Sequence, residues 1–104
     1  MISYKKVTFE EAKDIIDSTP NLMILDVREE EEYITGHAID AQLFTLANIN
    51  EDTANEMIPD KDTPILVYCR SGRRSKQAAQ ILVSLGYKTV YDVGGLIGWP
   101  YGLE

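Results

Sequence analysis

The chain has 104 residues, 44% of them hydrophobic and 26% charged, which suits one globular domain built around a single modest core. A formal net charge of −7 with only ten Lys and Arg argues against general affinity for nucleic acid or anionic membranes, and no apolar stretch approaches the roughly 20 residues of a membrane helix. Residues 1–6 lack the apolar segment and cleavage site of a secretory signal, so we expect a cytoplasmic protein.

Local signals in the first part of the chain predict a helix followed by a buried strand. Thr8 and Glu11 stand at the spacing of a capping box, and apolar residues then recur at helical spacing to about Asp17. Residues 18–21, which include a proline, break this helix. Residues 22–27 form a nearly continuous apolar run, as expected for a strand buried on both faces of a parallel sheet.

Helices and strands alternate along the rest of the chain. We expect, in order, a short acidic helix over 29–34, a brief strand over 41–44, a helix over 49–57, a strand over 64–68, a helix from Arg74 to Leu85 ended by Gly86, and a strand over 89–93. Gly94-Gly95 is interpreted as a tight turn after the last strand. This alternation predicts the α/β class with a mainly parallel sheet, in which the functional crevice lies at the carboxyl ends of the strands.

The most informative segment runs from Cys69 to Ser75 and reads Cys-Arg-Ser-Gly-Arg-Arg-Ser. It contains the only cysteine, directly after the strand predicted over 64–68, and it carries three arginines although the protein is acidic. One cysteine forms neither an internal disulfide nor a multi-cysteine metal site, and we predict no bound metal. A thiol between a buried strand and a helix start is placed to ionise and to attack.

Several features of this segment are expected to favour the thiolate of Cys69. The helix that begins near Arg74 offers unpaired N–H groups and the positive end of its dipole. Gly72 lets the loop curl so that its amides point inward as an anion-binding nest. Fixed charges and hydroxyl donors add to this effect, and they come from Arg70, Ser71, Arg73, Arg74 and Ser75. We therefore predict a lowered pKa for Cys69 and an anionic substrate on the loop from Arg70 to Ser75.

The candidate residues also have structural interpretations. A lone cysteine at a strand end is often a small buried apolar residue, but a purely apolar site would not adjoin so many cations. His37, the only histidine, could pair with Cys69, and we favour a turn residue that bonds the backbone after Gly36. Asp26 and Arg28 could face the pocket, and we favour a role in tying loops together. The acidic residues 29–32 are interpreted as a solvated helix start rather than a metal site.

Four motifs in order resemble the rhodanese family of sulfurtransferases, specifically its single-domain members. They are the Asp-x-Arg-Glu ending of residues 24–29, the helix and Gly-His turn of residues 32–37, the loop from Cys69 to Ser75, and the closing segment with Leu85-Gly-Tyr87, Val93-Gly-Gly95 and Trp99. The resemblance covers nearly the whole chain. It implies a rhodanese-like three-layer α/β/α sandwich around a mainly parallel sheet of about five strands, in one domain over residues 1–104.

The resemblance also implies a thiosulfate sulfurtransferase in which Cys69 is the nucleophile. Cys69 would take a sulfane sulfur from thiosulfate or a similar anionic donor, hold it as a covalent persulfide, and pass it to cyanide or a thiol. The amides from Arg70 to Ser75 would cradle the persulfide, while Arg70, Arg73 or Arg74 would orient the donor. No metal or organic cofactor is expected, and a monomer is the default state.

Two other functions stay open on the same scaffold. The chain could be a sulfur carrier or regulatory module whose Cys69 is loaded and unloaded by partner proteins. It could also be a phosphatase or arsenate reductase, although phosphatase relatives have one residue more between the cysteine and the following arginine than the four that separate Cys69 from Arg74. The shorter loop favours a sulfur atom over phosphate.

The sequence departs from the family pattern in one turn and in the segment after it, where Gln42-Leu43-Phe44 replaces the usual Asn-containing pattern. Ala38-Ile39-Asp40-Ala41 stands where members often have an Ile-Pro-Gly-Ala type of turn. This departure affects the turn and the pocket rim and leaves the cysteine loop untouched. Leu103-Glu104 is the kind of pair that a cloning vector leaves behind, and we attach no weight to it.

Overall fold

The computed structural model describes residues 3–104, which form a five-stranded parallel sheet. The strand order is β1-β5-β4-β2-β3, and each neighbouring pair is parallel. The strands are β1 (Lys5–Lys6), β2 (Met23–Asp26), β3 (Gln42–Leu43), β4 (Ile65–Cys69) and β5 (Val90–Gly95). The helices are α1 (Phe9–Ser18), α2 (Glu30–Thr35), α3 (Glu51–Met57) and α4 (Arg73–Ser84), with a 3-10 turn η1 (Leu46–Asn48). Within residues 3–104, no helix is both long enough and apolar enough to cross a membrane.

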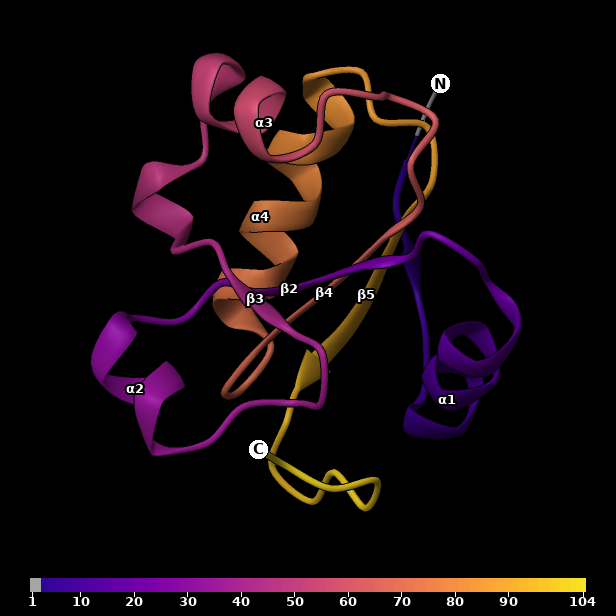
Figure 1. Ribbon diagram of the computed structural model, residues 1–104, viewed down its shortest axis with the longest axis vertical. Helices are drawn as coiled ribbons and strands as arrows, with labels where there is room; N and C mark the ends of the chain where they lie inside the picture. Colours follow the sequence, from indigo (N-terminus) through magenta and orange to yellow (C-terminus); the bar gives the residue numbers. More distant parts are fainter. Residues whose placement is uncertain (1–2) are drawn as a thin grey trace.

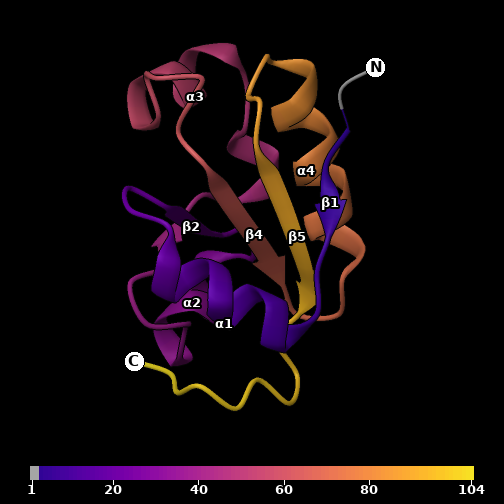
Figure 2. The same ribbon diagram turned by 90° about the vertical axis from the view of Figure 1, so that its right-hand side faces the viewer.

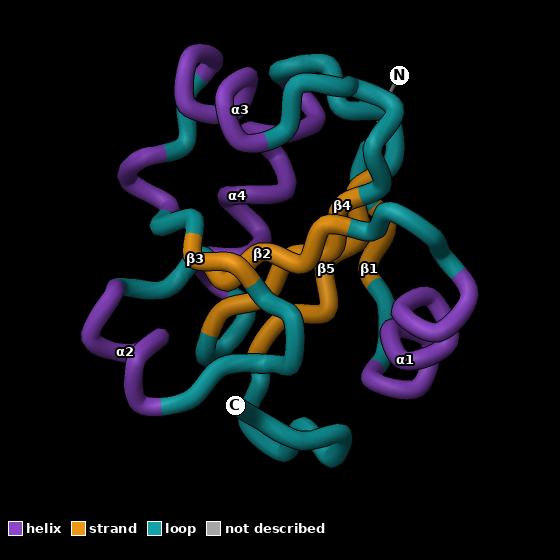
Figure 3. Tube along the Cα trace, viewed as in Figure 1, coloured by secondary structure: helices purple, strands orange, loops and turns teal. Residues whose placement is uncertain are grey.

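Helices cover both faces of the sheet, so the predicted α/β/α sandwich is confirmed (Figures 1 and 3). On one face, α1 packs against a cluster that includes Leu66 and Tyr68 of β4. On the other face, α3 and α4 cover a second cluster that includes Val67 and Cys69. Alternate residues of β4 therefore enter the two cores, as the pleat of a strand buried on both faces requires.

The site is positioned by the two central strands, β2 and β4. Every residue of β4 is buried, and Cys69 is its last residue. Asp26 is the last residue of β2 and lies opposite Tyr68 in register. Because the strands are parallel, these carboxyl ends meet at one edge of the sheet, beside the C-terminal segment (Figure 2). This edge is the one at which the sequence predicts the functional crevice.

The structure confirms most predicted elements and shifts several boundaries. Thr8 caps α1 as expected, because Thr8 and Glu11 form both hydrogen bonds of the capping box. α1 ends one residue later than expected, and α4 begins one residue earlier, directly after Gly72. The helix expected over 49–57 is shorter, because the side chain of Asn50 caps α3 and η1 precedes it.

The sheet differs from the sequence prediction in two places. β1 is not predicted, because Lys5 and Lys6 are exposed lysines that carry no apolar signal and join the sheet through their backbone. Gly94-Gly95 is not a tight turn. These glycines are the last two residues of β5, and they pair with Tyr68 and Cys69.

The C-terminal segment folds back onto the turn that departs from the family pattern. Ala38 and Leu103 form an antiparallel bridge, and His37 and Glu104 exchange two backbone hydrogen bonds of 3.0 and 2.8 Å. Asp40 adopts a φ of +69°, within a turn closed by a bond from the N–H of Ala41 to the carbonyl of Ala38. Leu103 and Glu104, which carry no signal in the sequence, thus hold this turn in place.

Candidate active site

The cysteine loop turns tightly between β4 and α4. Cys69 is buried, and its Sγ accepts a hydrogen bond of 3.0 Å from the N–H of Gly72. Gly72 has a φ of +101°, a left-handed conformation that favours glycine, and it is the residue that precedes α4. The sulfur therefore lies at the amino end of a twelve-residue helix, inside the turn made by its own loop.

Donors around the sulfur favour its ionised form. Burial of Cys69 opposes ionisation, but the hydroxyl and N–H of Ser75 and the N–H groups of Gly72 and Ser71 outweigh this effect, so the pKa of the thiol lies below its ordinary value. The direction is the one expected from the sequence. The leading causes are loop amides and a hydroxyl, however, rather than the arginines.

Ser75 is the least obvious of these donors. It is fully buried in the first turn of α4, and its Oγ lies 3.2 Å from the carbonyl oxygen of Gly72. Since a hydroxyl has one proton, Ser75 can donate to this carbonyl beside a neutral thiol and to the sulfur beside a thiolate. The side chain can therefore donate in either protonation state of Cys69.

The loop rests directly on the end of β5. A Cβ added to Gly95 would lie 2.8 Å from the Cα of Ser71 and closer still to the carbonyl oxygen of Arg70, distances that real Cβ atoms do not show. The N–H of Leu96 also donates to the carbonyl of Cys69 at 3.0 Å. The glycine at position 95 is therefore required by close backbone approach, which the tight-turn interpretation missed.

The three arginines of the loop differ in their surroundings. Arg74 is bound to Glu32 of α2 by two contacts, 2.6 Å between Nη1 and Oε1 and 3.0 Å between Nη2 and Oε2. This bidentate bond lowers the pKa of Glu32 to about 2 and raises that of Arg74. Arg70 and Arg73 are exposed and form no ion pair with another residue in the range 3–104. The free cations beside Cys69 are thus Arg70 and Arg73.

A small pocket opens beside the cysteine loop. It has a volume of about 280 Å³ and contains Arg70 together with residues from α2 and from the segment after β5; its lining is Arg28, Glu32, Thr35, Arg70, Leu96 and Ile97. Two guanidinium groups therefore line a cleft whose outer rim carries Ile97, a side chain that is 70% exposed.

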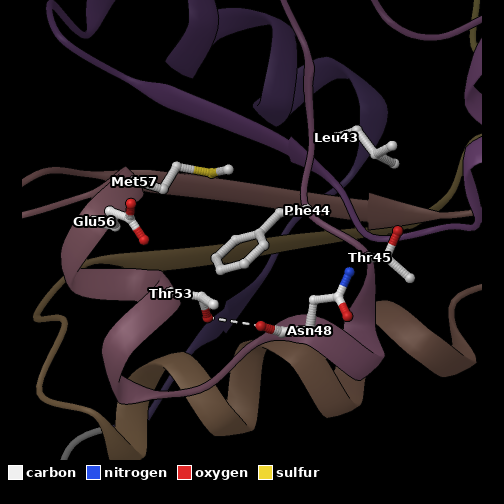
Figure 4. Close-up of a pocket in the computed structure, with 7 residues that line it drawn as sticks. All are labelled: Leu43, Phe44, Thr45, Asn48, Thr53, Glu56 and Met57. Atoms are coloured by element: carbon white, nitrogen blue, oxygen red, sulfur yellow. Dashed lines mark hydrogen bonds between the residues drawn. The ribbon is translucent and has the colours of Figure 1, made fainter.

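A larger pocket of about 420 Å³ lies elsewhere, between β3, η1 and α3 (Figure 4). The ring of Phe44 and the side chain of Met57 give it an apolar lining, and Thr53 donates a hydrogen bond to the carbonyl of Asn48 at its side (Figure 4). None of the site residues expected from the sequence lines this pocket. Its lining residues include no thiol that could act as Cys69 does.

The buried Asp26 and the partly buried Arg28 form an ion pair that ties loops together. Arg28 Nη2 lies 2.7 Å from Asp26 Oδ2 and also donates to the carbonyl of Gly36 at 2.7 Å. The hydroxyl of Tyr68 donates to Asp26 at 2.7 Å and accepts the N–H of Ala38 at 3.0 Å. This network gives the pair the structural role favoured by the sequence, and Arg28 in addition faces the small pocket.

His37 bonds the backbone, as the turn interpretation expects. Its Nδ1 lies 3.0 Å from the carbonyl oxygen of Tyr33, and its ring stacks on that of Tyr33 at 3.8 Å. Nε2 lies 3.7 Å from Oε1 of Glu104. Nδ1 is therefore engaged by the backbone, and Nε2 faces the carboxylate of Glu104.

Sequence reasoning missed Glu32 as a partner of the loop. It belongs to the acidic run interpreted as a solvated helix start, and no local pattern marks which of those acids meets Arg74. Within residues 3–104, no three His, Cys, Asp or Glu side chains gather where they could hold a metal ion. The site is therefore described by one thiol, its amide and hydroxyl donors, and two free arginines.

Comparison with known proteins finds consistent similarity. The family profile described as "Rhodanese-like domain" matches residues 8–100. Thiosulfate sulfurtransferase GlpE of Coxiella burnetii is 34% identical over 97 residues, which cover 92% of this chain and 87% of that protein. A structure of a rhodanese with anions from E. coli matches 80% of this chain and 96% of its own with 32% identity and a TM-score of 0.73. The rhodanese-like domain of an Anabaena protein matches all of this chain and 80% of its own with 26% identity and a TM-score of 0.82.

Proposed function

The chain belongs to the rhodanese-like domain family, and from this membership we propose that it is a sulfurtransferase that carries a sulfane sulfur from thiosulfate, or a similar anionic donor, to a thiophilic acceptor. The observation that carries the proposal is the position of Cys69 Sγ at the amino end of α4, with the Gly72 N–H bonded to it at 3.0 Å. The lowered pKa of the thiol supports a nucleophilic role.

The proposed reaction has two covalent steps. The Cys69 thiolate attacks the outer sulfur of thiosulfate, the S–S bond of the donor breaks, and sulfite leaves with the electron pair. A thiolate or cyanide then attacks the terminal sulfur of the Cys69 persulfide, and the second S–S bond breaks to restore the thiolate. The cycle requires no metal or organic cofactor, because the sulfur is held covalently between the two steps.

The surrounding residues have distinct proposed roles. The N–H groups of Ser71, Gly72 and Ser75 and the hydroxyl of Ser75 hold the negative charge on the thiolate and, after the first step, on the persulfide. Arg70 attracts the anionic donor, because it lines the adjoining pocket and forms no ion pair with another residue in the range 3–104. Arg73 adds positive charge at the exposed start of α4.

One observation favours a second candidate, a sulfur carrier that exchanges sulfur with partner proteins. Ile97 is 70% exposed at the rim of the pocket beside Arg70, where a small inorganic donor needs no apolar contact. An apolar side chain next to a free cation fits a partner surface that is partly apolar and acidic. In this case Cys69 would acquire sulfur from a partner and turn over free thiosulfate poorly.

A phosphatase or arsenate reductase is disfavoured by the ion pair of Arg74. Both terminal nitrogens of its guanidinium bond the carboxylate of Glu32, so its bidentate fork is directed at an acid rather than at a bound phosphate group. This contact adds a geometric reason to the argument from loop length.

The test measures thiocyanate formation from thiosulfate and cyanide for the wild type and for Cys69→Ser, with mass spectrometry of the protein after donor treatment. Since Cys69 is the only cysteine, a gain of one sulfur atom reports this site alone. Arg70→Ala is compared with Arg73→Ala under varied thiosulfate, and we expect the KM for thiosulfate to rise more in Arg70→Ala. Ser84→Ala, at the far end of α4, serves as the control.

The outcomes separate the candidates. Turnover by the wild type, with a sulfur adduct that Cys69→Ser lacks, supports the enzyme. An adduct that forms only from a loaded partner protein supports the carrier. If no donor places sulfur on Cys69 and phosphate esters are hydrolysed instead, the sulfurtransferase proposal is wrong.

A further inference from the structure

Asp92 is a buried acid that none of the proposed steps uses. It lies in the middle of β5, its side chain is fully buried, and Oδ2 has no hydrogen-bond partner among residues 3–104. Burial of a carboxylate without a full set of hydrogen-bond partners destabilises the folded state, so we expect a compensating hydrogen bond elsewhere on the side chain. That contact is made by its other oxygen.

Oδ1 of Asp92 forms a hydrogen bond at an irregularity in β5. It accepts a hydrogen bond of 2.8 Å from the N–H of Gly94, two residues further along the strand. Here the register with β4 shifts: Val67 lies opposite Asp92, but Tyr68 lies opposite Gly94, so Val93 is an extra residue. This arrangement is a β-bulge, in which one ladder amide loses its partner in the neighbouring strand. The side chain of Asp92 supplies an acceptor for that amide.

The bulge sets the position of the two glycines that support the cysteine loop. A Cβ added to Gly72 would lie 3.7 Å from the Cα of Gly94 and 3.7 Å from the N of Gly95. Gly95 lies against the backbone of Arg70 and Ser71 more closely than any Cβ would allow. A displacement of Gly94 or Gly95 therefore moves the backbone whose N–H groups surround Cys69.

We propose that Asp92 is a positioning residue for Cys69, which acts through the bulge at Gly94 and Gly95 to hold the cysteine loop against β5. The path runs from Asp92 Oδ1 through its hydrogen bond to the Gly94 N–H, from Gly94 to the neighbouring Gly72, where a Cβ on either glycine would meet the other, and from the Gly72 N–H to the sulfur. Asp92 does not touch the reacting atoms. The role extends the proposed function, but it concerns the shape of the loop and holds whatever the sulfur donor is.

The structure assigns this role to the acceptor oxygen of Asp92 rather than to its charge. The carboxylate makes no ion pair among residues 3–104, and Oδ2 bonds nothing there. Asparagine keeps the acceptor at the same place and removes the charge, whereas leucine, which has the same branching and somewhat more bulk, removes the acceptor. The two replacements are therefore expected to differ in their effect on Cys69.

Other charged groups near the loop stay constant in this comparison. They are Lys6 of β1, whose Nζ lies 3.6 Å from the Cβ position of Gly94, Glu32 of α2, and the arginines Arg28, Arg70, Arg73 and Arg74. Because these groups are the same in all variants and the three Asp92 variants all lack its carboxylate, a difference in the titration of Cys69 between Asp92→Asn and the other two reports on the bulge.

The experiment compares Asp92→Asn, Asp92→Leu and Asp92→Ala with a matched core variant, Val90→Ala. Val90 lies buried at the other end of β5, so its truncation destabilises the same strand without touching the bulge. The rate of Cys69 alkylation by iodoacetamide is followed across the pH range in which thiols ionise, and kcat and KM with thiosulfate are measured beside it. Asp92→Ala removes the acceptor without adding bulk, and it serves if Asp92→Leu does not fold.

We expect alkylation at neutral pH to fall by about tenfold in Asp92→Leu and Asp92→Ala, with the midpoint moved to higher pH, because a buried N–H loses its acceptor and the loop shifts. Asp92→Asn and Val90→Ala are expected to keep the wild-type midpoint, and kcat should fall in the first two variants with little change in KM. An unchanged midpoint in Asp92→Ala, or an equal shift in Asp92→Asn, overturns the proposal. If the midpoints behave as expected but the wild type transfers no sulfur, the proposed function fails and this inference stands.

Discussion

Replacement of Gly95 by alanine tests whether β5 supports the cysteine loop. Gly95 is not among the glycines with a positive φ, so an alanine at this position meets no backbone strain and acts only through the volume of its methyl group. That methyl group would lie 2.8 Å from the Cα of Ser71 and 2.9 Å from the carbonyl carbon of Arg70. Both are backbone atoms, which cannot rotate away as a side chain can.

The size of the effect follows from these distances. Ordinary van der Waals contact begins at 3.4 Å, so the backbone at Ser71 must retreat from 2.8 Å by at least 0.6 Å. Overpacking of this kind costs about 1–3 kcal/mol, and a domain of this length loses about 4–8 °C of Tm for each kcal/mol. A misplacement approaching 1 Å at a reacting group costs up to about 10²-fold in rate, so we expect kcat/KM to fall by about tenfold or more.

The assay measures Cys69 alkylation against pH, together with turnover and thermal unfolding, for Gly95→Ala and for Gly86→Ala. Gly86 has a φ of +102° and no atom within 4 Å of its Cβ position, so alanine there introduces strain of about 1–2 kcal/mol without a clash. The two variants should lose comparable stability. Only Gly95→Ala should slow alkylation at neutral pH, because only this variant displaces the amides that favour the thiolate.

A folded Gly95→Ala protein with wild-type alkylation and turnover would refute this reasoning. Such a result would mean that the loop does not rest on β5, or that it can retreat without changing the donors around the sulfur. Equal losses of reactivity in both variants would show that general destabilisation, and not the contact at Gly95, governs Cys69.

Three further predictions concern contacts around the loop. Glu32→Gln should lower the free energy of unfolding by about 0.5–1 kcal/mol through loss of the pair with Arg74. Because the pKa of Glu32 is lowered from 4.5 to about 2, this deficit should be constant above pH 4.5 and shrink as the pH falls towards 2 in urea titrations. Ser75→Ala should raise the pKa of Cys69 and slow its alkylation at neutral pH by about tenfold, and an unchanged rate would remove the hydroxyl from the donor set. Tyr68→Phe should cost about 1–3 kcal/mol in denaturant unfolding, because its hydroxyl both accepts a buried amide and donates to a buried carboxylate.

Much of the site could be predicted from local sequence. The place of Cys69 between a buried strand and a helix follows from the apolar run before it and the apolar stripe after it. Gly72 is the one residue of the loop that readily adopts a φ of +101°, so the tight turn around the sulfur is also a local property. The lowered pKa of the thiol follows from the hydroxyl of Ser75 in the first turn of the helix and from the N–H groups that the turn and the helix start direct inward.

The partners of the arginines could not be predicted in this way. Three arginines in one loop look equivalent in sequence, but Arg74 meets Glu32, a residue 42 positions away, whereas Arg70 and Arg73 form no ion pair within residues 3–104. The choice depends on where α2 lies relative to the first turn of α4. No spacing within either segment contains that information.

The sequence by itself determined most of the elements, the reactive cysteine and the curvature of its loop, because each depends on residues within a few positions of one another. Only the tertiary structure decided what the loop rests on. Gly94 and Gly95 read as a turn, but in the sheet they extend β5 beside Tyr68 and Cys69, and the buried Asp92 holds the bulge before them. The order and register of parallel strands, which arise from packing between distant segments, bring these residues to the cysteine loop.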